Sequence, residues 1–168
     1  SHLNVLWTGD SVEGCVGFYP SQTFAVELDR RDQVKVTRRL LTDSLQEWSR
    51  HFATVTVAAV AGNHGENRNG GGKAFTGVHD NDDLAIVEQV AEILAANEDA
   101  YGHVRFAVAR DNVTVTVPAA GWIIGVTHGH IARSGANAES KLRSWWEKQA
   151  AGKQAVGDSD VLVSGHFH

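Results

Sequence analysis

Residues that can bind metal ions follow four apolar segments of this sequence. The segments are LNVLWTGD, ATVTVAAVAGNH, GWIIGVTHGH and SDVLVSGHFH, and each contains glycine beside Asp, Asn or His. The candidate ligands are Asp10, Asn63, His128, His166 and His168. One carboxylate, one amide oxygen and three imidazoles, without a thiolate, form a set of donors that suits manganese, iron or zinc. The sequence therefore predicts a metal centre.

The apolar segments also indicate how these residues could meet. Their near-continuous apolar character is typical of strands that are covered on both faces, as in α/β sheets. In layered α/β folds, ligand sites collect at the carboxyl ends of the strands, because loops from neighbouring strands converge there. Every candidate ligand stands at such an end. We therefore predict an α/β fold whose strands bring the candidates together.

Helical patterns separate the predicted strands. Apolar residues recur at three- and four-residue spacing over 34–52 and 84–94, and a third pattern covers 142–146. The second helix follows possible caps at 80–82. The stretch HVRFAVARDNVTVTV instead predicts a hairpin that turns near 111–112, because its second arm roughly alternates between apolar and polar residues.

Composition limits the classes of protein to consider. The chain has 168 residues, 42% of them hydrophobic, so a single domain over 1–168 is the economical expectation. No apolar stretch approaches the roughly 20 residues of a membrane span, and no secretory leader is evident. The lone Cys15 cannot form an internal disulfide, and a net charge of −5 provides no general attraction for nucleic acid. We expect a soluble, cytoplasmic protein without a membrane partner.

Each motif also has a plain structural explanation. Gly-Asp and Gly-Asn are frequent in turns, and the histidines of THGH could be partly exposed. The last His-x-His is more specific, because alternate residues of an extended segment fall on one face. Chance would have to place ligand-type residues at the same end of four separate segments, which favours the metal centre. A structural zinc domain with a closed site of four ligands is a further alternative.

Taken in order, these motifs resemble those of the calcineurin-like metallophosphoesterase family. The matching residues extend over essentially the whole chain and are Gly9-Asp10, Gly62-Asn63-His64, His128-Gly129 and Gly165-His166-Phe167-His168. The resemblance implies a layered α/β/β/α sandwich. The stretches NHGENRNGGGKAF and DNDD are most similar to phage-type members described as DNA repair exonucleases.

The resemblance also implies that the family's catalytic domain extends beyond this sequence. An Asp-x-His motif belongs on a strand before LNVLWTGD, and Ser1-His2 lacks the aspartate. In the family, further chain follows the last His-x-His. We therefore expect 1–168 to be a fragment without the first strand and without C-terminal residues.

Two divalent metal ions are the cofactors that the resemblance implies, with Mn²⁺ as the first choice and Fe, Zn or Ni as alternatives. Asp10 would bridge both ions. Asn63, His128 and His166 would complete the shell of the second ion, and His168 would belong to the first. Two cations lower the pKa of a bound water and neutralise phosphate oxygens during in-line displacement.

His64 would be the catalytic residue by the same resemblance. It would contact the phosphate or protonate the leaving oxygen. The sequence departs from the family pattern here, since Gly65 replaces the expected acidic residue and Glu66 follows one place later. The partner that orients the His64 ring is therefore open.

Two details of the pattern allow alternatives. His130 is a rival of His128 as the ligand in THGH, although the family's ligand is the histidine that precedes glycine. Glu13 stands where the family often has an acidic residue, and we expect it to be a solvated side chain or a helper within its loop.

Cations that could hold a substrate stand in two places. Arg68 and Lys73 belong to the glycine-rich loop ENRNGGGK, which could present cations and backbone amides to phosphates or could be a surface loop. A second group is interleaved with acidic residues and is expected to be mostly a solvated helix face: Arg30, Arg31, Lys35, Arg38 and Arg39.

The sequence thus predicts a metal-dependent phosphoesterase that acts on a phosphoester substrate. The most specific form of this prediction is a phosphodiesterase or nuclease that hydrolyses DNA. The alternatives are a phosphomonoesterase, a small-molecule phosphodiesterase, and a non-catalytic binding scaffold of the same fold. The oligomeric state is left open.

Overall fold

The computed structural model describes residues 1–15, 22–69, 72–110, 112–132 and 137–167. In chain order, its elements are β1 (His2–Trp7), α1 (Gln22–Ala25), α2 (Arg30–Trp48), β2 (Thr54–Ala59), α3 (Asp82–Ala95), α4 (Glu98–Tyr101), β3 (Val104–Val108), β4 (Thr114–Ala119), β5 (Trp122–Thr127), η1 (His130–Ala132), α5 (Ala138–Ala151), η2 (Ala155–Asp158) and β6 (Val161–Ser164). This mixture of helices and strands confirms the predicted α/β class.

The two helices on the first sheet begin at side-chain caps. The side chain of Asp29 accepts a hydrogen bond from the backbone N–H of Asp32 at the start of α2, at 2.9 Å. Asn81 does the same for Asp83 at the start of α3, also at 2.9 Å. Such caps satisfy helix N–H groups that have no partner within the helix. The predicted cap region 80–82 therefore contains the actual cap.

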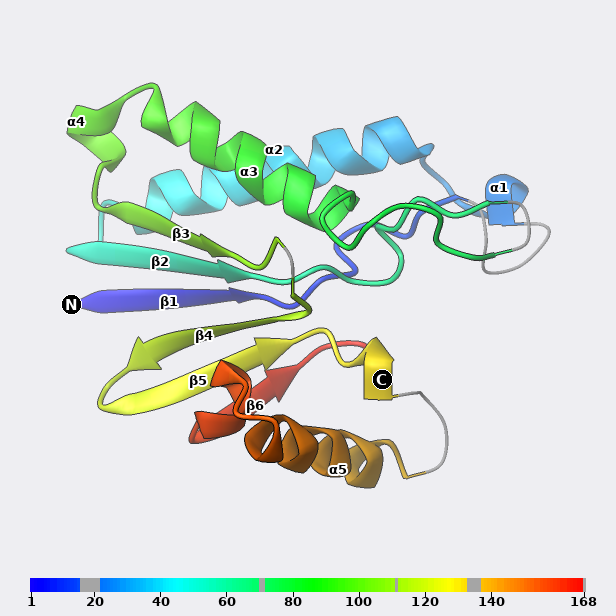
Figure 1. Ribbon diagram of the computed structural model, residues 1–168. Helices are drawn as coiled ribbons and strands as arrows, with labels where there is room; N and C mark the ends of the chain where they lie inside the picture. The colour runs from blue at the N-terminus through cyan, green and yellow to red at the C-terminus, as the bar shows by residue number, and fades with distance from the viewer. Residues whose placement is uncertain (16–21, 70–71, 111, 133–136, 168) are drawn as a thin grey trace.

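The first sheet consists of β1, β2 and β3, in that order and all parallel. Helices α2 and α3 lie on one face of it (Figure 1). Because strand side chains alternate between faces, odd-numbered residues of β2 point toward these helices. The resulting core contains the buried residues Leu41, Leu45, Val55, Val57, Ile86, Val87, Val90 and Leu94.

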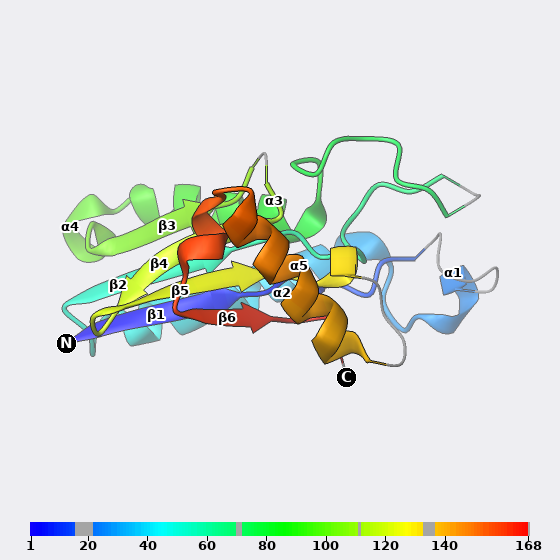
Figure 2. The ribbon, with the colours of Figure 1, turned by 60° about the horizontal axis from the view of Figure 1, so that its bottom comes forward.

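The second sheet consists of β4, β5 and β6, with β4 antiparallel and β6 parallel to β5. Helix α5 lies along its outer side (Figures 1 and 2). Trp146 of α5 donates a hydrogen bond from Nε1 to the carbonyl oxygen of Val156 at 2.7 Å. A second buried cluster contains residues of both sheets, namely Ala58, Val60, Ala109, Val117 and Val126. The two sheets therefore pack against each other through small apolar side chains.

The hairpin predicted for 103–117 is wrong. Its first arm, β3, pairs with β2 in the first sheet, whereas its second arm, β4, pairs with β5 in the second. The actual hairpin joins β4 to β5 through Ala120 and Gly121, both of which have positive φ. The sequence pattern predicted two strands but not their partners, because alternation reports only the buried face of each strand.

The parallel strands carry their loops to one side of the molecule. In Figure 1 the arrowheads of β1, β2, β3, β5 and β6 all point to that side. It is the side to which the sequence assigned the candidate ligands. Within the described ranges, no helix is both long and apolar enough to cross a membrane.

Candidate functional site

The strand ends bring four of the predicted ligands together. Asp10 follows β1, Asn63 follows β2, His128 follows β5 and His166 follows β6. Nε2 of His128 lies 2.9 Å from Oδ1 of Asn63 and 3.0 Å from Oδ2 of Asp10. The same atom lies 3.2 Å from Nδ1 of His166. Ligand atoms of Asp10, His128 and His166 all lie within 4.8 Å of one another.

The hydrogen bonds of His128 leave its Nε2 atom facing three electron-rich atoms. Nδ1 lies 2.7 Å from the carbonyl oxygen of Thr8, and because a carbonyl only accepts, Nδ1 carries a proton. A neutral His128 ring then presents a lone pair to Asp10, Asn63 and His166. A single proton cannot be shared equally among these groups, whereas a divalent cation can bind them together. The residues therefore fit such an ion.

The electrostatics of the cluster favour positive charge beside Asp10. Burial alone lowers the pKa of His128, but hydrogen bonds to Asp10 and Thr8 outweigh it and raise the pKa above its ordinary value. Burial alone raises the pKa of Asp10, yet hydrogen bonds from His128 and from the backbone of His64 lower it overall. Without a bound cation, an ionised Asp10 and a protonated His128 therefore stabilise each other.

Two of the candidate ligands have an unusual backbone conformation. Asp10 has φ of 53° and His166 has φ of 69°, both in the left-handed region that residues with a side chain seldom adopt. Strain of this kind costs about 1–3 kcal/mol and persists only where the surrounding structure imposes it. Its presence at Asp10 and His166 agrees with a functional role for the loops that follow β1 and β6.

The loops after β1 and β2 touch at two glycines. A Cβ atom on Gly9, whose φ is +85°, would lie 2.4 Å from the backbone nitrogen of Gly62. A Cβ atom on Gly62 would lie 2.2 Å from the backbone nitrogen of Asp10. Any side chain at either position would overlap backbone atoms. This contact holds Asp10 beside the loop that carries Asn63.

The buried carboxylate of Asp83 links the same two loops through hydrogen bonds. Asp83 is 0% exposed and lies in the first turn of α3. Its oxygens accept hydrogen bonds from the backbone N–H groups of Asp10 at 3.0 Å, Ser11 at 2.8 Å and Gly62 at 2.9 Å, and from the Ser11 hydroxyl. Sequence reasoning missed this residue, because it considered only 80–82 at this point, as possible helix caps. An acidic residue two positions beyond the cap, on the apolar side of the helix, was the available signal.

The structure leaves no room for the acidic side chain that the sequence resemblance implies at position 65. A Cβ atom on Gly65 would lie 2.4 Å from Oδ1 of Asn81 and 3.0 Å from Oδ2 of Asp83. An acidic side chain directly after His64 would therefore collide with Asn81 and meet a second carboxylate. In this chain, the carboxylate beside position 65 belongs to Asp83.

His64 stands next to the cluster, and Glu13 holds its ring. Nδ1 of His64 lies 2.8 Å from the backbone carbonyl oxygen of Glu13, so this nitrogen donates. Nε2 lies 3.9 Å from Oδ2 of Asp10, and the backbone N–H of His64 donates to Oδ1 of Asp10 at 2.8 Å. The Glu13 carboxylate is half exposed and lies 3.8 Å from Nδ1. The orienting partner is thus the main chain of Glu13.

His130 lies beside the cluster, with its ring centroid 5.3 Å from that of His128 and 6.3 Å from that of His166. Burial, together with the neighbouring His128 and His166, lowers the pKa of His130 to about 4, so the ring is neutral near pH 7. Its Nε2 atom lies 4.0 Å from Oε1 of Glu66. Among the described residues, the three-ligand grouping contains His128 and not His130.

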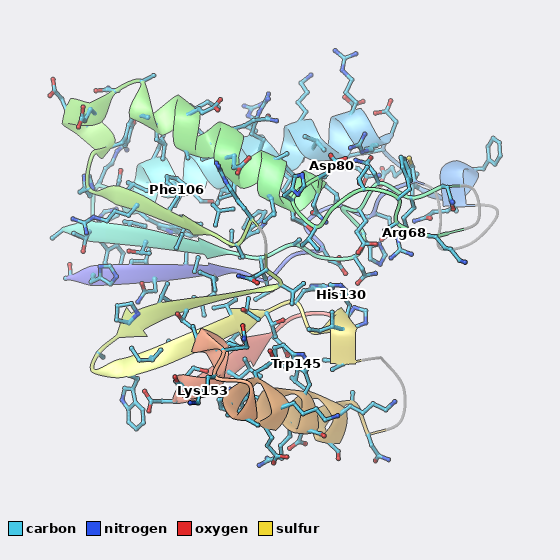
Figure 3. All side chains as sticks on the ribbon, viewed as in Figure 1. Arg68, Asp80, Phe106, His130, Trp145 and Lys153 are labelled. Atoms are coloured by element: carbon cyan, nitrogen blue, oxygen red, sulfur yellow. The ribbon has the colours of Figure 1, made fainter. Side chains whose placement is uncertain are left out.

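The predicted substrate-binding cations lie in the loop after Asn63. Arg68 is labelled in Figure 3 near the same end of the molecule as His130. Its guanidinium pairs with Glu66 at 2.8 Å and donates to the carbonyl oxygen of Gly72 at 2.8 Å. Lys73 is exposed. Arg68 is thus engaged within its own loop, and substrate contact by Arg68 and Lys73 stays a prediction.

The fifth predicted ligand, His168, lies outside the described residues. No family model matches the chain, and no curated protein or solved structure gives a significant match. The class of protein therefore rests on the fold and on the site: an α/β protein in which two sheets direct one carboxylate, one amide and two imidazoles to a single cluster.

Proposed function

We propose that the protein is a metal-dependent phosphoesterase that hydrolyses phosphodiester bonds, with DNA as its substrate. The observation that carries this proposal is the convergence of Asp10, Asn63, His128 and His166 from four strand ends, with His64 held beside them. We further propose that the two sheets and their helices form the layered α/β/β/α sandwich of the calcineurin-like metallophosphoesterases. A cytoplasmic location belongs to the same proposal.

The metal-binding residues of this proposal are those of the cluster. Asp10, Asn63, His128 and His166 would hold one divalent ion, Mn²⁺ in the first instance, and Fe, Zn or Ni suit the same donors. Asp10 would also contact a second ion, for which the resemblance assigns His168. Bound divalent ions supply activation of water near neutral pH and stabilisation of charge on the phosphate.

The protein's own contribution is to fix these groups before the substrate arrives. The Thr8 carbonyl sets the tautomer of His128, so that Nε2 faces the other donors. The Glu13 carbonyl sets the tautomer of His64, so that its Nε2 lies on the side of Asp10. A histidine in this position can contact a phosphate oxygen or give a proton to the leaving oxygen. Such a fixed ring favours catalysis over a pure binding scaffold.

Hydrolysis of bis-p-nitrophenyl phosphate with Mn²⁺ tests the proposal. We expect turnover by the unsubstituted chain, loss of turnover in His166→Ala, and a loss of about 10²–10⁴-fold in His64→Ala, the range typical of a general acid or base. His51→Ala is the matched control, because His51 is exposed and pairs only with Glu47 on its own helix among the described ion pairs. Metal binding without hydrolysis of any ester would contradict the proposal and support the scaffold.

A further inference from the structure

Four cations line a groove near the start of helices α2 and α3. It encloses about 800 Å³ between one face of α2, the start of α3 and Cys15. Its cationic lining residues are Arg30, Arg31, Lys35 and Arg38, and its carboxylates are Asp29 and Asp82. Concentration of Arg and Lys in one hollow is the electrostatic pattern that attracts phosphates.

Both carboxylates in the groove already have partners. Asp82 accepts a hydrogen bond from Nε of Arg30 at 2.6 Å, within a two-point ion pair. Asp29 caps α2 by accepting from the backbone of Asp32. The remaining lining cations are Arg31, Lys35 and Arg38, and within the described ranges none of them forms an ion pair.

Cations elsewhere along α2 are compensated differently. Arg39 lies 3.7 Å from Asp43, and Arg50, just after the helix, lies 3.1 Å from Glu47. Arg38 in the groove instead bonds to the neutral amide of Gln89 at 3.0 Å. The uncompensated positive charge of this helix is thus confined to the groove.

The spacing of these cations matches a strand of phosphates. Residues 31, 35 and 38 fall on one face of α2, because they are four and seven positions apart. At 1.5 Å per residue they extend over about 10 Å along the helix. Phosphates along one strand of a DNA duplex repeat every roughly 3.4 Å along its axis, and they are farther apart when the strand is extended. A single strand could therefore place several phosphates against this row.

A short chain segment connects the groove to the candidate site. Cys15 lines the groove and stands two residues after Glu13, whose carbonyl holds His64. Two consecutive Cα steps cover at most about 7.6 Å. The side-chain amide of Gln33 in α2 fixes the intervening Gly14: its oxygen accepts from the Gly14 N–H at 2.9 Å, and its nitrogen donates to the Gly14 carbonyl oxygen at 3.1 Å. The segment between the site and the groove is therefore tied to α2.

We propose that the groove formed by Arg31, Lys35 and Arg38 binds the sugar-phosphate backbone of a single DNA strand whose scissile bond lies at the candidate site. The inference rests on the proposed function and deepens it, because it assigns the path of a polymeric substrate. Contacts to phosphates alone make this binding independent of base sequence.

Fluorescence anisotropy of a labelled oligo-dT, measured in EDTA over a series of salt concentrations, tests the groove. For R31Q/K35Q we expect weaker binding and a salt slope reduced by about 1.4, since each lost phosphate contact on a single strand removes roughly 0.7. The control R39Q/R50Q changes the net charge equally, at one position on α2 and one just after it, both outside the groove, and should leave the slope nearly unchanged. Glutamine keeps the helix propensity of the exposed positions.

Hydrolysis of bis-p-nitrophenyl phosphate separates this inference from the proposed function. This small ester does not reach the groove, so R31Q/K35Q should hydrolyse it at the unsubstituted rate. Equal effects of R31Q/K35Q and R39Q/R50Q on oligo-dT binding would overturn the proposed role of the groove, whatever the result of the hydrolysis assay. Absence of hydrolysis by the unsubstituted chain would overturn the proposed function. The comparison of oligo-dT binding between the two double variants could still be interpreted, because it does not depend on hydrolysis.

Discussion

Oδ2 of Asp83 accepts a hydrogen bond from the backbone N–H of Asp10 at 3.0 Å, across 73 positions of sequence. The same carboxylate binds the backbone of Ser11 and Gly62, so it joins the loops after β1 and β2 beneath the candidate site. A buried acceptor with several donors is costly to remove, because each donor left without a partner costs about 1–3 kcal/mol. The shape of the site should therefore depend on a residue outside its ligand set.

Asp83→Ala should lower the free energy of unfolding by about 3 kcal/mol or more, because buried backbone N–H groups lose their acceptor. Urea denaturation measures this change. Asp80→Asn, at an exposed position just before α3, should stay within about 0.5 kcal/mol of the unsubstituted chain. A loss below about 1 kcal/mol for Asp83→Ala would show that the loops do not rely on this carboxylate.

Replacement of Gly9 should separate backbone strain from steric overlap. Alanine at Gly9 meets both a φ of +85° and the backbone of Gly62, whereas alanine at Gly121 meets a φ of +88° with nothing within 4 Å. Left-handed strain alone costs about 1–2 kcal/mol. Gly9→Ala should exceed Gly121→Ala by more than about 1 kcal/mol in thermal or urea unfolding, since overlap adds to strain. Equal losses would mean that the two loops separate easily.

Metal affinity should depend on the cluster and not on histidine content. Asp10→Ala and His166→Ala should each weaken Mn²⁺ binding by more than the roughly 10–100-fold that loss of an outer partner causes. Isothermal titration calorimetry provides the measurement, with His51→Ala as the control. A His166→Ala chain that binds Mn²⁺ as tightly as the unsubstituted chain would exclude His166 as a ligand.

Metal affinity should also rise with pH. The pKa of His128 is raised above its ordinary value of 6.5, so a proton competes with the cation at Nε2 until the pH exceeds this raised value. Without added metal, the stabilisation from this shift is complete below the unfolded value of 6.5 and is lost as pH rises through the folded pKa of His128. Calorimetry in buffers of different ionisation enthalpy counts the proton released. Affinity that falls between about pH 6 and pH 9 would contradict this assignment.

Glu13 provides a test of how His64 is oriented. Because the Glu13 carbonyl accepts from Nδ1 of His64, Glu13→Gln keeps this hydrogen bond and should reduce kcat for the aryl phosphodiester less than about tenfold. His64→Ala should remove most of the turnover while Mn²⁺ affinity stays nearly the same. A Glu13→Gln chain as impaired as His64→Ala would mean that the carboxylate, at 3.8 Å, is the true partner.

The ends of the strands could be predicted from the sequence because apolar runs and glycine-bounded turns are local signals. LNVLWTGD, for example, contains β1 and places Asp10 just after it, and GWIIGVTHGH contains β5 followed by His128. The division of 103–117 between two sheets could not be predicted, because pairing is a long-range property. The carboxylate of Asp83 was missed for the same reason, since its partners stand far away in sequence.

The candidate ligands are divided between the halves of the molecule. Asp10 and Asn63 extend from the first sheet, His128 and His166 from the second, and the seam between the sheets is filled with small side chains such as Ala58. An ion bound by residues of both sheets would link the two sheets directly. Hydrogen exchange at β4 to β6 should then slow when Mn²⁺ is added, because the two sheets cannot separate until the ion dissociates. The metal ion would then govern the rate at which the two sheets separate, as well as the chemistry of the site.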